Sequence, residues 1–99
     1  MNNNEFKQWL IDNNAYSSKK MVTDCVSRAA RMEKAFQATD TNFSYQREYD
    51  KDFGELFCKL ISRRGIDIKV PIDLPIGTNQ MDTLVSATKK YFLFLKSTH

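Results

Sequence analysis

Apolar residues recur at spacings of three and four along most of the chain, which is typical of amphipathic α-helices. The first such stretch is short and begins after an asparagine N-cap, Asn3 or Asn4. It ends at the paired asparagines 13 and 14. The apolar stripe of this first helix consists of Phe6, Trp9 and Leu10.

The second stretch carries the clearest helical pattern. Ser17 or Ser18 is the expected N-cap, and the periodicity runs to Phe36. A polar connection, residues 37–43, follows it. The apolar stripe comprises Val22, Cys25, Val26, Ala29, Met32 and Phe36.

The third stretch predicts a firm helix from about Asp52 to Arg64 that extends back toward Tyr45. Gly54 lies inside it and weakens it by roughly 1 kcal/mol relative to alanine. Gly65 suits the residue after its end. The apolar residues at helical spacing are Tyr49, Phe53, Leu56, Phe57, Leu60 and Ile61.

A last helix begins after Thr78 or Asn79 and carries an almost unbroken apolar stripe. Leu93 and Phe94 lie off that stripe. Two bulky apolar residues there indicate a helix that is buried on more than one face or that contacts another chain. The stripe itself comprises Met81, Leu84, Val85, Thr88, Tyr91, Phe92 and Leu95.

Residues 65–77, GIDIKVPIDLPIG, follow a different rule. Every even position is a branched aliphatic residue and every odd position is not, which is the period of extended chain with one buried face. No second run of this kind exists to pair with it, and Pro71 and Pro75 lack N–H groups. We expect an extended strap that packs its aliphatic side chains on the helices. The alternative is an edge that pairs with another chain, with Ile72 and Leu74 at the contact.

These elements predict one all-α domain over residues 1–99: a small four-helix bundle with an extended strap between helices three and four. The N-terminal residues have no apolar signal segment, and no apolar run reaches the length of a membrane span. Cys25 and Cys58 fall on apolar helix faces, as reduced core thiols do. We therefore expect a cytoplasmic protein, although a disulfide between the two helices is the minority alternative.

Residues that carry catalysis are sparse. The single histidine is His99, and neither a metal-ligand spacing nor a glycine-rich phosphate loop is present. Asp52 and Glu55 could share a helix face as an acid pair or hard-metal site, but a solvated helix start favoured by the helix dipole is the preferred explanation. We expect a chain that is not an enzyme and that needs no metal, cofactor or small-molecule substrate.

Positive charge gathers on the second helix. Its five basic residues against Asp24 and Glu33 leave an excess of +3, which equals the net charge of the whole chain, +3. A solvated outer face explains such a surface, and so does a surface that contacts nucleic-acid phosphates. The residues expected at a nucleic-acid surface are Ser17, Ser18, Lys19, Lys20, Arg28, Arg31 and Lys34, with Lys89 and Lys90 from the last helix.

The run FKQWLIDNNAYSSKKMVTDCVSRAARMEKAF resembles the opening of the N-terminal core-binding (SAM-like) domain of tyrosine recombinases and phage integrases. The last helix, MDTLVSATKKYFLFL, is similar to that domain's closing helix. The N-terminal helical segment also resembles a segment of some restriction-system proteins. The resemblance implies a SAM-like fold whose second and fourth helices begin near DNA phosphates. The recombinases' separate catalytic residues have no counterpart here, so the resemblance assigns no nucleophile to Tyr91.

Two hypotheses follow for function. The first is a non-catalytic DNA-binding or DNA-associated accessory module of a mobile-element, phage or restriction system. The alternative is a protein–protein interaction module: a homodimer, or a small inhibitor or adaptor that docks on a larger nucleic-acid-processing protein. Leu93, Phe94, Ile72 and Leu74 are the expected interface residues of the second hypothesis.

Overall fold

The computed structural model describes residues 1–98, and His99 lies outside the described residues. The described part is all-helical and contains no strand, which confirms the predicted fold class. The number of helices is five rather than four, because the third predicted helix is divided in two. The helices are α1 Asn3–Asp12, α2 Lys19–Thr39, α3 Tyr45–Asp52, α4 Glu55–Ile61 and α5 Asn79–Thr98.

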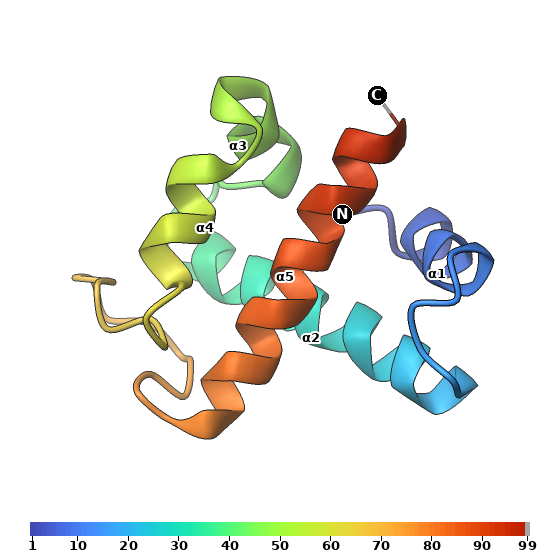
Figure 1. Cartoon of the computed structure of the whole chain (residues 1–99). Coiled ribbons are helices and arrows are strands. Elements are labelled where there is room, and N and C mark those ends of the chain that lie inside the picture. Colours follow the sequence, from blue (N-terminus) through green and yellow to red (C-terminus); the bar gives the residue numbers. More distant parts are fainter. Residues whose placement is uncertain (99) are drawn as a thin grey trace.

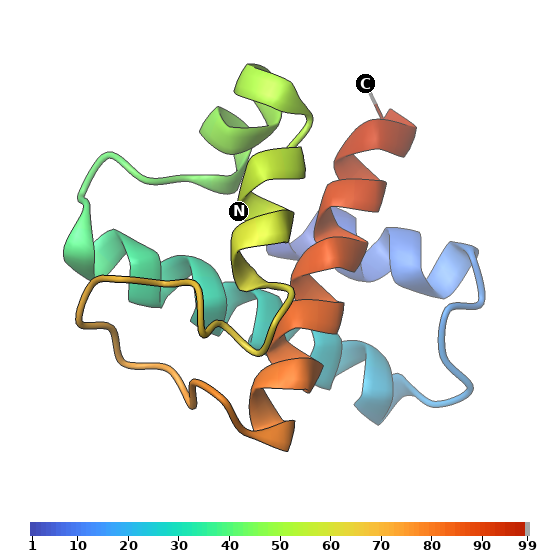
Figure 2. The ribbon, with the colours of Figure 1, turned by 60° about the vertical axis from the view of Figure 1, so that its left-hand side comes forward.

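The two long helices, α2 and α5, cross each other and form the centre of the fold (Figure 1). Helix α1 lies on one side of α5, and α3 and α4 lie on the other (Figures 1 and 2). The stripe predicted for the last helix is buried along its whole length, from Met81 to Leu95. Among residues 1–98, no helix is both long and apolar enough to span a bilayer.

Side-chain caps fix the beginnings of three helices. The Asn2 side chain accepts a hydrogen bond from the backbone N–H of Glu5, so the N-cap of α1 is Asn2 rather than the expected Asn3 or Asn4. Ser18 caps α2 as expected, by accepting from the N–H of Met21. Ser44 caps α3 in the same way. At its other end α2 continues to Thr39, three residues beyond the end of its apolar pattern.

The break between α3 and α4 has a local cause. Phe53 and Gly54 both adopt left-handed backbone conformations, with φ of 62° and 76°. A Cβ atom on Gly54 would lie 2.4 Å from ring carbons of Phe92. The chain therefore turns at the one residue that lets α4 approach α5 closely. Gly54 is the N-cap residue of α4 and has no capping side chain, so the carboxylate of Asp52 instead accepts from the N–H groups of Gly54 and Leu56 at the start of α4.

The strap over residues 65–77 is not a strand, as predicted, but it is not straight either. The N–H of Ile76 donates to the carbonyl of Leu74 at 2.8 Å, so the chain turns tightly around Pro75. The N–H of Gly77 donates to the carbonyl of Arg64 at 2.8 Å and closes the strap at its base. Only part of the predicted packing occurs. Ile68, Ile72, Leu74 and Ile76 are half-buried against the core, while Ile66 and Val70 are exposed.

Candidate nucleic-acid interface

The outer face of α2 carries four exposed cations, Lys20, Arg28, Arg31 and Lys34. Each apolar residue predicted for the inner face is buried except Val26, which is half-buried, so the amphipathic pattern orients the helix correctly. None of the ion pairs formed within residues 1–98 involves these four cations. Their charges are therefore available to an external anion.

Three neighbouring hollows lie along this face, with volumes of about 550, 180 and 220 Å³. Ser27 and Arg31 line both the first and the second, and Arg28 and Thr83 line both the second and the third. We call the three hollows together the α2 trough. Its lining residues are Met1, Asn3, Tyr16, Cys25, Val26, Ser27, Arg28, Ala30, Arg31, Glu33, Lys34, Gln37, Gln80, Asp82, Thr83, Leu84, Ser86 and Ala87.

The two carboxylates that line the trough are already paired. Glu33 accepts from the Met1 amino group at 2.9 Å, and Asp82 contacts the guanidinium of Arg64 at 3.2 Å. Arg28 and Arg31 remain without a carboxylate partner among the described residues. The trough therefore combines free guanidinium groups with neutral hydrogen-bonding side chains, a composition suited to phosphate oxygens.

The Tyr16 ring lines one end of the trough, and a further cation lies beside that ring. The Lys90 ammonium lies 5.6 Å from the centre of the Tyr16 ring. Burial, followed by a hydrogen bond with Cys25, raises the pKa of Tyr16 to about 12. Burial also raises the pKa of Cys25, although Tyr16, Lys90 and Arg28 oppose that shift. Lys90 and Arg28 thus act on the same end of the trough from two different helices.

The start of α2 is separate from the trough. Ser17, Ser18 and Lys19 are exposed, but the Ser18 hydroxyl oxygen is occupied by its capping bond to Met21. Lys19 lines a different hollow of about 190 Å³, on the side of α1, together with Lys7, Ile11 and Val22. The part of the expected nucleic-acid surface around Lys19 is thus not continuous with Arg28 and Arg31.

Lys89 and Lys90 diverge although they are adjacent in sequence. Lys90 faces Tyr16, whereas Lys89 acts electrostatically on Cys58 of α4, where it opposes the burial that raises the pKa of that thiol. Successive residues on a helix point about 100° apart, so neighbours rarely serve one site. Of the nine expected residues, Arg28, Arg31 and Lys34 line the α2 trough, and Lys90 lies beside its Tyr16 end without lining it.

The predicted protein interface needs one correction. Leu93 is 55% exposed, but Phe94 is only 3% exposed and cannot contact another chain. Its ring lies 5.6 Å from that of Phe6 and 5.9 Å from that of Trp9, because α1 covers this side of α5. The reading of α5 as buried on more than one face is correct for Phe94. Ile72 and Leu74 are half-buried and pack on the core.

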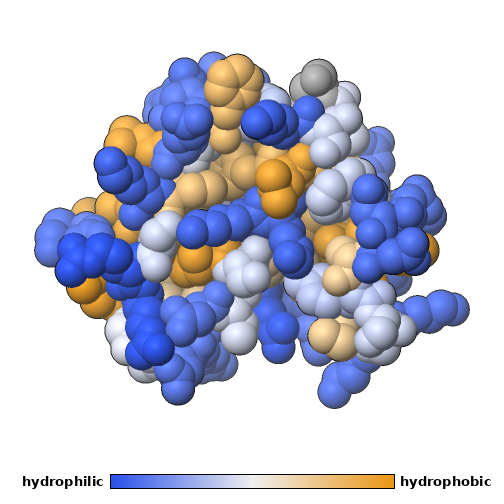
Figure 3. Space-filling model, viewed as in Figure 1, coloured by the Kyte–Doolittle hydropathy of each residue, from blue (hydrophilic) through white to orange (hydrophobic). Residues whose placement is uncertain are grey.

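A different apolar surface appears on α4. Leu56 is 73% exposed and Phe53 is 64% exposed, although sequence periodicity places both with the core residues. The turn at Phe53 and Gly54 rotates them outward. Figure 3 shows apolar side chains over α3 and α4 on this face. We call this surface the α4 groove, a hollow of about 430 Å³ lined by Glu48, Leu56, Phe57, Lys59, Leu60 and Asp67.

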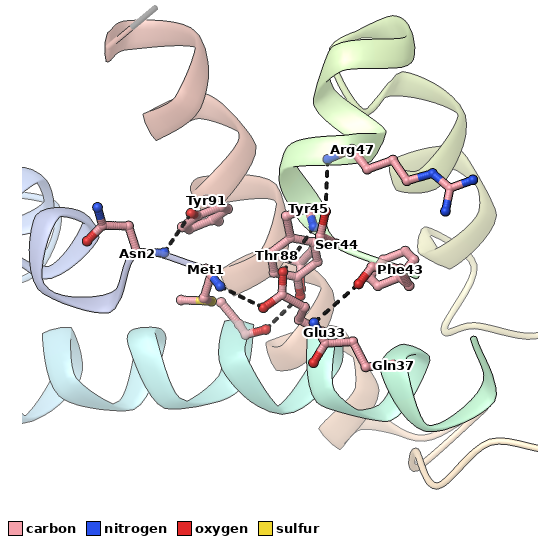
Figure 4. Close-up of polar contacts among 11 residues, drawn as sticks. Met1, Asn2, Glu33, Gln37, Phe43, Ser44, Tyr45, Arg47, Thr88 and Tyr91 are labelled. Atoms are coloured by element: carbon pink, nitrogen blue, oxygen red, sulfur yellow. Dashed lines mark hydrogen bonds and ion pairs between the residues drawn. The ribbon is translucent and has the colours of Figure 1, made fainter. Parts of the chain in front are cut away.

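Glu33 is a buried acid that the sequence pattern did not single out. It is 5% exposed, and its carboxylate accepts from the Met1 amino group and from the backbone N–H of Tyr45 (Figure 4). The Tyr45 hydroxyl donates to the carbonyl of Ala29 at 2.6 Å and lies 3.3 Å from the Thr88 hydroxyl. This network joins α2, α3 and α5. The Glu33 carboxylate therefore serves the fold through its bonds to Met1 and Tyr45.

The described residues hold no cluster of three or more metal-binding side chains. Burial raises the pKa of both thiols, which makes them weaker nucleophiles at neutral pH than a free cysteine. No family model, no curated protein and no solved structure matches this chain.

Proposed function

We propose that this chain is a non-catalytic DNA-binding accessory module and that the α2 trough contacts the DNA backbone. The single observation that supports this proposal is the pair Arg28 and Arg31. Both arginines lack a carboxylate partner within residues 1–98, and both line a hollow with Ser27, Gln80 and Thr83. The resemblance of α2 to the core-binding domain of tyrosine recombinases favours the same partner.

The chemistry of these side chains fits phosphate. A guanidinium group presents paired N–H donors that match two phosphate oxygens, and hydroxyl and amide groups add neutral donors. Arg28, Arg31 and Lys34 succeed one another every third residue, which places them on adjacent turns of one helix. Such a row follows a line of phosphates and carries no base specificity.

A salt titration tests the proposal. Fluorescence anisotropy with labelled DNA at about 50 mM salt should detect binding, and log affinity should fall with log salt at a slope of about −3 to −4 for four contacts. The double change R28E/R31E should reduce affinity at least about tenfold and make the slope shallower by about two. Absence of binding to any DNA at this salt concentration would refute the proposal.

Lys89→Glu provides the matched control. It reverses the same charge on an exposed residue, but Lys89 faces α4 rather than the trough. Equal losses for Lys89→Glu and Arg31→Glu would show that only net charge matters, and not the trough.

A second candidate function, docking on a partner protein, is favoured by a separate observation. The α4 groove exposes Leu56 by 73%, more than any other large hydrophobic residue of the described chain. An exposed apolar side chain beside a hollow is a common anchor position of interfaces. Leu56→Asp should abolish self-association or partner capture and leave DNA binding unchanged. A monomer by light scattering at high concentration would exclude the homodimer form.

A further inference from the structure

In the α2 trough, arginine side chains alternate with hollows. Arg31 stands where the first and second hollows meet, and Arg28 stands where the second and third meet. Each arginine therefore has a hollow on both sides. A flat basic surface, which would suit any polyanion, has no such alternation.

Single-stranded and double-stranded DNA would contact the arginines and hollows of the α2 trough differently. A duplex keeps its bases stacked inside and presents a convex rim of phosphates, so it would touch the arginines and leave the hollows empty. A single strand has a narrow backbone with free sugars and bases, and it can lie along a channel. The three hollows have volumes of about 550, 180 and 220 Å³, so each is a small recess that the bulk of a duplex would not enter.

The spacing of the cations agrees with a short single strand. From Arg28 through Arg31 to Lys34 the helix axis rises about 9 Å, since each residue adds about 1.5 Å. Phosphates of one strand rise about 3.4 Å each along the helix axis when the bases are stacked and lie farther apart when the bases are unstacked, so this length covers about two to three of them. Ser27 and Thr83 line the second hollow together with the two arginines, so their hydroxyl groups are available to sugar and base edges.

We propose that the α2 trough binds single-stranded DNA in preference to duplex, with Arg28 and Arg31 on successive phosphates and the hollows occupied by the nucleosides between them. This inference rests on the proposed function and specifies the form of DNA.

The experiment compares a labelled 12-nucleotide oligothymidine with a 12-base-pair duplex at equal salt. Duplex has the higher charge density, so charge alone would favour it. We expect the single strand to bind about fivefold more tightly or better, with a log–log salt slope of about −2 for three phosphates. Equal or tighter binding of the duplex would overturn this inference and leave the proposed function intact. Failure of both probes to bind would overturn the proposed function itself.

A variant that leaves the net charge unchanged tests whether the shape of the hollows, and not only charge, contributes to affinity for the single strand. Ser27→Leu fills the space shared by the first and second hollows on an exposed helix position, so the fold should tolerate it. Leucine is chosen because an aromatic side chain would stack on bases. Affinity for oligothymidine should fall at least about threefold, and affinity for duplex should stay the same. An unchanged affinity for oligothymidine would show that the hollows are not used.

Discussion

The carboxylate of Glu33 accepts a hydrogen bond from the backbone N–H of Tyr45 at 3.0 Å, in the buried interior of the fold. Tyr45 is the first residue of α3, so its N–H has no partner within that helix. A charged side chain of α2 thereby fixes where α3 begins. The Tyr45 ring then extends between α2 and α5, where its hydroxyl reaches both helices.

Two replacements of Glu33 distinguish the contribution of its hydrogen bond to stability from the contribution of its charge. Glu33→Gln keeps an oxygen acceptor for the Tyr45 N–H and should cost about 1 kcal/mol of unfolding free energy. Glu33→Leu leaves that N–H unsatisfied and should cost about 2–3 kcal/mol. Urea unfolding followed by circular dichroism measures both. Equal stability of Glu33→Leu and the parent chain would contradict a structural role.

The burial of the Tyr45 hydroxyl predicts that the protein loses stability at alkaline pH. Burial raises its pKa well above the usual value of 10.0. Below pH 10 the phenol is protonated in both the folded and the unfolded chain, so it adds no pH dependence. Above pH 10 the unfolded chain ionises first, and the free energy of unfolding falls by up to about 1.4 kcal/mol per pH unit for this residue.

Tyr45→Phe is the control for that pH dependence. It removes the titrating hydroxyl and costs about 1–2 kcal/mol at neutral pH through the lost bonds to Ala29 and Thr88. Its stability should decline less between pH 10 and 11 than that of the parent chain. Denaturant titrations at these two pH values measure both declines, and equal declines in the unfolding free energy of Tyr45→Phe and of the parent chain would contradict the raised pKa of Tyr45.

Two glycines form a matched pair that tests the α3–α4 turn. Gly54 and Gly77 have nearly the same backbone angle, with φ of 76° and 79°. A Cβ on Gly54 would clash with the Phe92 ring, whereas a Cβ on Gly77 would meet nothing within 4 Å. Gly77→Ala should cost about 1–2 kcal/mol from backbone strain alone, and Gly54→Ala about 3 kcal/mol or more. Similar costs would mean that Phe92 yields easily.

Leu93 and Phe94 test the burial of α5 on two faces. Phe94→Ala removes a ring that contacts Phe6, Trp9 and Tyr91, and should cost about 3–5 kcal/mol. Leu93→Ala changes an exposed side chain and should change stability by less than about 0.5 kcal/mol. Thermal melts of both variants suffice. A large loss for Leu93→Ala would place that residue in an interface between chains.

The helical class and the buried stripes of α2 and α5 follow from the sequence because their periodicity is long and unbroken. The α3–α4 turn does not, since Phe53 keeps helical spacing while its backbone is left-handed. Side-chain spacing carries no information on that angle. The exposure of Leu56 cannot be predicted from the sequence for the same reason.

The candidate site was predictable in part. Arg28, Arg31 and Lys34 share an outer helix face, and helical geometry places them correctly. The contributions of Gln80 and Thr83 depend on how α5 crosses α2, which no local pattern encodes. The same holds for the separation of Lys89 from Lys90 and for the burial of Glu33, whose partners lie far away in sequence.

The central claim is that DNA binds in the α2 trough, and mapping of backbone amide shifts by NMR tests it most directly. During separate titrations of the labelled chain with 12-nucleotide oligothymidine and with the 12-base-pair duplex, the shifts caused by whichever DNA binds should concentrate at residues 27–34 of α2 and 80–84 of α5. Amides of α4 and of the strap should not move. Shifts confined to the α4 groove around Leu56, or no shifts at millimolar DNA, would contradict the claim.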